Sequence, residues 1–145
     1  MIQAKQLLPL SLVVAALASG YYSQDIIALL RPAAEPIDLS QYCQLSRQAC
    51  HQQGVEVRME HDNAHPLKPT RIFVHWPAQT QPKLDMQLDG LEMAMNTLRF
   101  RLSATENGDY EGVFLLPVCT LEAMTWVGNI SDGHQEIKVA IRMER

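Results

Sequence analysis

Four side chains that carry sulfur are the candidates for chemistry in this sequence of 145 residues. Met93 and Met95 lie one residue apart in the segment 88–102, and Cys119 and Met124 follow in the segment LPVCTLEAMTW. A thiolate and thioethers are soft ligands, which suit Cu(I) better than Mg, Ca or Mn. On a strand, the two-residue period would point Met93 and Met95 to one face. The pattern predicts a Cu(I) site at Met93, Met95, Cys119 and Met124.

Core filling is the alternative interpretation of the same residues, because methionine adapts to irregular gaps and a lone thiol can behave as a small apolar side chain. Two other metal centres fit the pattern poorly. Structural zinc takes four Cys or His ligands. A blue-copper centre needs two histidines beside its cysteine, and no histidine lies between Cys119 and Met124. His61 and His65 could hold a divalent ion, but a polar turn is the favoured interpretation.

Cys43 and Cys50 are expected to form a disulfide, because an exported chain lies where disulfides persist. The pair would close a small loop at the start of the folded domain. A dithiol used for redox or metal transfer is the alternative, although the spacing differs from the C-x-x-C of redox motifs. This pairing leaves Cys119 as the odd cysteine.

The N-terminal segment predicts export. After Lys5, the run 6–24 has 19 residues without a charge, close to the roughly 20 that span a bilayer as a helix. The basic flank on its N-terminal side predicts a cytoplasmic N-terminus. A cleaved signal peptide is the alternative, supported by the A-x-A at 16–18. We expect a membrane anchor or signal peptide at 1–30, a proline-containing linker at 31–40 and an exported domain at 41–145.

The exported domain is predicted to be all-β, because most of it alternates apolar and polar residues. About seven short strands suggest an antiparallel two-sheet sandwich of immunoglobulin or cupredoxin type. A short helix in 88–98 is the alternative to a strand or a loop followed by a strand. Asn107-Gly108 signals a hairpin. The expected strands are 55–62, 71–76, 83–90, 97–104, 110–117, 124–130 and 136–143.

Charge and motifs exclude other classes of function. The net charge of -4 gives no basic surface for nucleic acid. The sequence has no G-x-S-x-G, no glycine-rich phosphate loop and no H-E-x-x-H. We therefore do not expect an enzyme.

The chain resembles the FixH-like proteins, which are bacterial inner-membrane proteins linked to copper supply and assembly of haem-copper oxidases. The resemblance rests on the segment LLPLSLVVAALASGYY and on GDYEGVFLLPVCTLEAMTWVGNI, where Trp126 would lie in the core of a sheet. It implies a single-pass inner-membrane protein with a periplasmic domain, and a respiratory oxidase or another copper protein as partner.

Two functions follow from the sequence. The first is binding or delivery of Cu(I), or assistance in assembling a copper-dependent respiratory oxidase. The second is a metal-free interaction module, or a small accessory subunit of a membrane complex. In the second case, apolar residues of the segment 113–118 would contact the partner, and Leu115 is the side chain expected to be exposed.

Overall fold

The computed structural model describes residues 16–17, 20–21, 36–77 and 79–145. The chain divides into two units, 1–37 and 38–145. In the first unit, 16–17 and 20–21 have helical backbone, and the rest of the expected anchor lies outside the described residues. Within the described ranges, no helix has the length and apolar character needed to cross a membrane.

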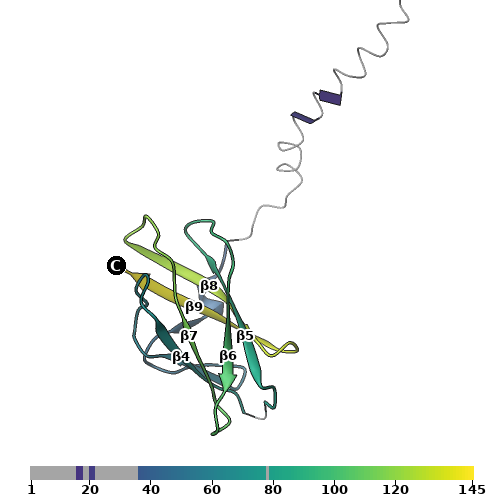
Figure 1. The fold of residues 1–145 in the computed structure, drawn as a ribbon, viewed down its shortest axis with the longest axis vertical. Helices are drawn as coiled ribbons and strands as arrows, with labels where there is room; N and C mark the ends of the chain where they lie inside the picture. The colour runs from purple at the N-terminus through teal and green to yellow at the C-terminus, as the bar shows by residue number, and fades with distance from the viewer. Residues whose placement is uncertain (1–15, 18–19, 22–35, 78) are drawn as a thin grey trace, which may run out of the picture. The chain divides into compact units, whose positions relative to one another are not determined.

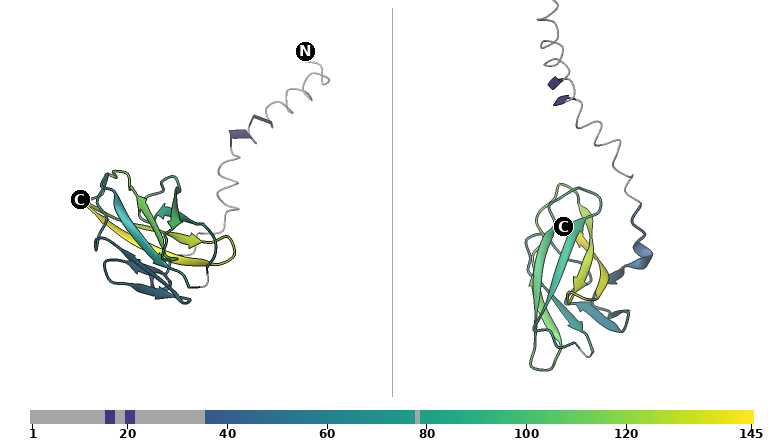
Figure 2. Two further views of the ribbon diagram at one scale, coloured as in Figure 1. Left: turned by 60° about the horizontal axis from the view of Figure 1, so that its bottom comes forward. Right: turned by 90° about the vertical axis from the view of Figure 1, so that its right-hand side faces the viewer.

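The second unit is all-β, which confirms the predicted class. After a short 3₁₀ helix, η1 (Leu39–Gln41), nine strands form one hydrogen-bonded sheet in the order β1-β9-β8-β5-β6-β7-β4-β3-β2 (Figures 1 and 2). Only the β1–β9 pair is parallel among the pairs of this sheet. The strands are β1 (Cys43–Leu45), β2 (Cys50–Gln52), β3 (Val55–Met59), β4 (Thr70–His75), β5 (Lys83–Gly90), β6 (Leu98–Ala104), β7 (Tyr110–Phe114), β8 (Ala123–Ser131) and β9 (Glu136–Glu144).

The alternating pattern places the core as expected. In β5 and β9, every inward position that the pattern indicated is buried, and the intervening charged residues are exposed. Trp126 on β8 is fully buried, as the sequence suggested. The hairpin at Asn107-Gly108 joins β6 to β7, with Gly108 at φ +84°. The two shortest strands, β1 and β2, were not predicted, which raises the strand count from about seven to nine.

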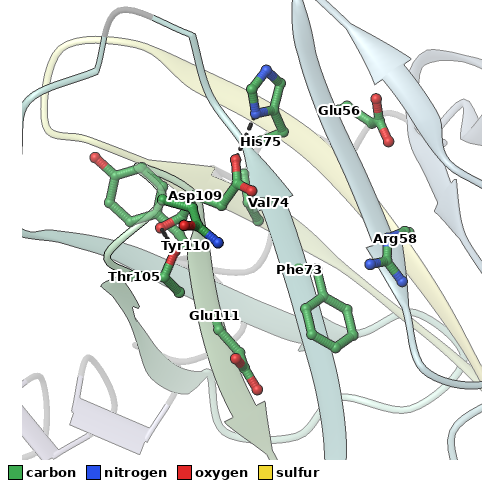
Figure 3. Close-up of a pocket in the computed structure, with 10 residues that line it drawn as sticks. Glu56, Arg58, Phe73, Val74, His75, Thr105, Asp109, Tyr110 and Glu111 are labelled. Atoms are coloured by element: carbon green, nitrogen blue, oxygen red, sulfur yellow. Dashed lines mark hydrogen bonds and ion pairs between the residues drawn. The ribbon is translucent and has the colours of Figure 1, made fainter.

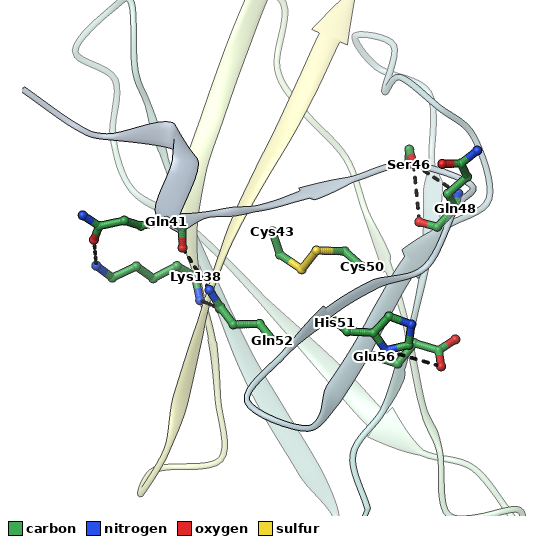
Figure 4. Close-up of a disulfide and its surroundings, with 9 residues drawn as sticks. All are labelled: Gln41, Cys43, Ser46, Gln48, Cys50, His51, Gln52, Glu56 and Lys138. Carbon is green, nitrogen blue, oxygen red and sulfur yellow. Dashed lines mark hydrogen bonds and ion pairs between the residues drawn. A yellow bond between two sulfur atoms is a disulfide. The ribbon is translucent and has the colours of Figure 1, made fainter.

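The sheet curls until its two edge strands meet, and the Cys43–Cys50 disulfide joins them. The cysteines lie on β1 and β2, at opposite ends of the strand order, with a Cα–Cα distance of 5.8 Å (Figure 4). The predicted disulfide is therefore present. It does not close a hairpin, because β1 pairs with β9 and β2 pairs with β3.

Polar contacts support this junction, which we call the seam. The side chain of Gln52 donates to the carbonyl oxygen of Gln41 at 2.9 Å and accepts from the backbone N–H of Lys138 at 2.7 Å (Figure 4). The backbone N–H of Met59 donates to the carbonyl of Ser46 at 2.7 Å. The seam thus joins β1 and β9 to β2 and β3 without a β1–β2 ladder.

Candidate metal centre

The two loops that carry the predicted sulfur ligands lie at one end of the domain. Strand β5 is antiparallel to both β6 and β8, and β6 is antiparallel to β7. The β5–β6 loop and the β7–β8 loop must therefore leave the sheet at the same end, and Figure 1 shows both loops near the C-terminus. We call this the sulfur end.

Met93 and Met95 lie in the β5–β6 loop rather than on a strand. Strand β5 ends at Gly90 and β6 begins at Leu98, so the strand period does not determine the directions of the two side chains. Both are partly buried and pack against the core. Of the alternatives for this segment, the structure has the loop followed by a strand.

Cys119 is buried in the β7–β8 loop and is a free thiol. Its Sγ donates a hydrogen bond to the carbonyl of Leu121 at 3.4 Å. The guanidinium of Arg145 donates to the carbonyl of Cys119 itself, and the backbone N–H of Arg145 donates to the carbonyl of Glu122 at 3.1 Å. The C-terminus therefore fixes the loop that presents the only free cysteine.

Met124 is the second residue of β8, and its side chain extends towards the end of β5, where the β5–β6 loop begins. It is fully buried, and its Cε occupies the space beside Gly90 that a Cβ there would need. The carbonyl oxygen of Met93 lies 2.6 Å from the same Cβ position. Gly90 therefore lets the Met124 side chain and the Met93 backbone approach one another.

Two further methionines lie at the sulfur end, and neither was predicted as a ligand from the sequence. Met143 on β9 is the direct Cα partner of Met124 and is buried. Directly opposed side chains in an antiparallel pair share a face, with Cβ atoms about 4.5–5.5 Å apart. Met59 ends β3 at the same end of the sheet. Five of the six methionines that the structure describes, and Cys119, thus belong to this end.

Glu92 ties the methionine loop to β8. Its Oε2 accepts a hydrogen bond from the backbone N–H of Thr125 at 2.7 Å, and its Oε1 lies 3.6 Å from the guanidinium of Arg142. Desolvation acts to raise the pKa of Glu92, but the hydrogen bonds from Thr125 and the charge of Arg142 outweigh it, so the pKa lies below its ordinary value. The ionised carboxylate therefore holds the two sulfur-bearing segments together.

The sulfur end carries thioethers and a thiol beside carboxylates, and the carboxylate of Glu92 is already engaged by Thr125 and Arg142. Within the part of the chain that the structure describes, no group of three or more His, Cys, Asp or Glu side chains is placed to hold a metal ion. The side chains of Met124 and Met143 are neighbours, and the Met93 backbone adjoins Met124. Cys119 comes from the adjoining loop. Thioethers and a thiolate are the ligand types that a soft monovalent cation prefers.

Two histidines, His61 and His65, lie at the sulfur end on the connection from β3 to β4, where they line one hollow. His65 Nδ1 is 2.8 Å from the carbonyl oxygen of Glu144. His75 Nδ1 is 2.6 Å from Asp109 Oδ1, in a hollow of about 380 Å³ on the outer face of β3, β4 and β7 (Figure 3). The Arg58 guanidinium covers the Phe73 ring beside it, 4.4 Å from the centroid. This hollow combines an exposed His–Asp pair with a mixed-charge rim.

An exposed apolar strip borders the sulfur end. Leu67 joins it because its backbone N–H donates to the carbonyl of Leu116 at 2.9 Å. Val118 directly precedes Cys119, and Leu121, whose carbonyl accepts the hydrogen bond of the Cys119 thiol, follows two residues later. Among the described residues of 38–145, all exposed large apolar side chains belong to this strip, namely Leu67, Val113, Leu115, Val118 and Leu121.

Comparisons of the chain with protein-family models, with curated proteins and with solved structures each found no match.

Proposed function

We propose that this protein binds Cu(I) at the sulfur end and delivers it to a partner protein. The observation that carries the proposal is the concentration of Met59, Met93, Met95, Met124, Met143 and Cys119 at one end of the sheet. Thioethers with one thiolate favour Cu(I) over hard cations. The partial exposure of Met93 and Met95 gives the metal a route in and out, whereas Cys119 and Met124 lie deeper.

The wider setting belongs to the same proposal. The resemblance to FixH-like proteins supports a bacterial inner-membrane protein with a cytoplasmic N-terminus and a periplasmic domain, which assists assembly of a copper-dependent respiratory oxidase. Within the observed all-β class, we also propose a two-sheet arrangement of immunoglobulin or cupredoxin type.

A Cu(I) titration of the full-length chain against a competing chelator tests this function. It is run without oxygen and with ascorbate as reductant. We expect one equivalent of Cu(I) to bind, at least tenfold more weakly in Cys119→Ser and in the double variant Met93→Leu/Met95→Leu. Met86→Leu is the matched control, because Met86 is buried in the middle of β5. Absence of binding, or unchanged affinity in Cys119→Ser, would overturn the proposal.

The apolar strip favours a second function, which is a metal-free interaction module or accessory subunit of a membrane complex. Exposed apolar side chains gathered in one place are typical of contact surfaces. Leu115→Glu should then release a complex that purifies with the wild-type chain from native membranes, with unchanged thermal unfolding. Arg99→Glu, on an exposed position of β6, is the control. Retention of the complex by Leu115→Glu would exclude this surface.

A further inference from the structure

Trp126 is the one buried side chain at the sulfur end whose polar atom lacks a protein partner. It is fully buried on β8, and its Nε1 makes no hydrogen bond with any described group. No other fully buried side-chain nitrogen or oxygen in the described part of the chain shares this property. Unpartnered buried donors are rare in proteins, because they lose water without gaining an acceptor. The N–H group itself cannot bind a cation, but no protein acceptor fixes the edge of this indole, so packing alone sets the position of its ring.

Trp126 is surrounded by the sulfur-bearing elements. Met124 precedes it by two residues on the same strand, so both side chains point to the same face. Its Cα partner on β5 is Gly90, which has no side chain, and Met124 Cε fills that space instead. Met143 is the diagonal neighbour on β9, because Trp126 pairs with Ile141. The methyl group of Met124 therefore lies at Gly90, directly across from Trp126, and Met143 lies diagonally across on β9.

We propose that Trp126 forms one wall of the metal site and that its ring contacts the bound cation. This inference rests on the proposed function. A tryptophan face is the most favourable aromatic surface for a cation, and the attraction grows when water is excluded. A monovalent soft cation with few ligands leaves one side open to such contact. A hydrated divalent ion has no open side, so the indole would also favour Cu(I) over divalent cations.

The test uses the fact that the chain has only two tryptophans, Trp76 and Trp126. In the Trp76→Phe variant, the remaining indole emission comes from Trp126 alone. The full-length variant is titrated separately with Cu(I), Ag(I) and Zn(II), and binding is measured in parallel by chelator competition. Ag(I) is a redox-inert soft cation whose heavy-atom quenching requires contact with the ring. We expect quenching that saturates at one equivalent of Cu(I) or Ag(I), and none with Zn(II).

Two affinity variants complete the test. Trp126→Phe should weaken Cu(I) binding about three- to tenfold, as expected for a weaker cation–π contact. Trp76→Phe should leave the affinity unchanged. If chelator competition shows binding but Ag(I) leaves Trp126 emission unchanged, the indole is not part of the site, and the proposed function still stands. If no binding occurs at all, the proposed function fails, and this inference fails with it. The emission experiment retains Trp126, so it remains decisive even if Trp126→Phe does not fold.

Discussion

The methyl group of Met124 fills the space beside Gly90 in which a side chain at that position would have to lie. Gly90 is the last residue of β5, and the β5–β6 loop turns away directly after it. This contact fixes the distance between the methionine loop and β8. Residue 90 must therefore be a glycine if Met124 is to keep this position.

Gly90→Ala should therefore destabilise the domain. The new methyl group would displace Met124 and the Met93 carbonyl, and overpacking of this kind costs about 1–3 kcal/mol of unfolding free energy. Urea unfolding of Gly90→Ala, Met124→Ala and the double variant Gly90→Ala/Met124→Ala measures the effect. The double variant should lose less unfolding free energy than the sum of the two single losses, because the two residues are coupled.

A second double-mutant cycle, with Gly128→Ala in place of Gly90→Ala, is the control. A Cβ at Gly128 would collide with the backbone of Gln87 rather than with a methionine. Its cost should add to that of Met124→Ala without coupling. Equal coupling energies in the two cycles would show that the destabilisation by Gly90→Ala does not arise from displacement of Met124.

If the proposed site is correct, Met143 should contribute to metal binding together with Met124, because the two residues are direct partners in the β8–β9 pair. Met143→Leu conserves volume and should cost less than about 1.5 kcal/mol of stability. If the proposed site is correct, its Cu(I) affinity should fall severalfold, while Met86→Leu shows a similar stability and unchanged affinity. Chelator competition measures the affinities, and urea unfolding measures the stabilities. Equal Cu(I) affinities in the two variants would remove Met143 from the site.

The disulfide at the seam should stabilise the domain measurably. It closes a loop with a sequence separation of 7, and the chain-entropy model gives about 2–3 kcal/mol for so short a loop. The double variant Cys43→Ala/Cys50→Ala should lower the urea midpoint accordingly. A thiol reductant should lower the wild-type midpoint in the same way and have no effect on the double variant. A reductant effect that persists in the double variant would point to a different cause.

Stability should fall in acid partly because Glu92 becomes protonated. Its pKa in the folded chain lies below the ordinary value, so its stabilising contribution is fully present above the unfolded pKa of about 4.3. The contribution is lost as the pH falls through the lower folded pKa. Unfolding midpoints of wild type and Glu92→Gln, measured from neutral pH to pH values below the carboxyl range, should differ at neutral pH and converge in acid. A constant difference would exclude ionisation as the cause.

The alternation of the sequence was sufficient to predict the long strands. Strand β5 has the predicted limits, 83–90, because its apolar positions alternate strictly and Gly90 ends the pattern. The strands β1 and β2 have three residues each, too few for a period to emerge. The parallel partner of β1 is β9, almost a hundred residues away, and no local signal encodes such a pairing.

The candidate site was predictable only in part, for a related reason. The types and spacing of Met93, Met95, Cys119 and Met124 indicated soft-metal chemistry. The neighbourhood of Met124 and Met143 depends on the β8–β9 register. The roles of Gly90 and Trp126 depend on the β5–β8 register. Registers between strands arise from the packed sheet as a whole, so the neighbours of these residues could not be predicted from the sequence.

The seam also affects the tendency of the newly made protein to aggregate. Open sheet edges recruit strands from other molecules, which leads to aggregation. In this domain the two edges belong to consecutive strands, β1 and β2, and a covalent bond between them completes their closure. In the reduced chain, only the hydrogen bonds of the seam would hold the two edges together. Formation of the disulfide should therefore also lower the tendency of the two edge strands to pair with strands of other copies.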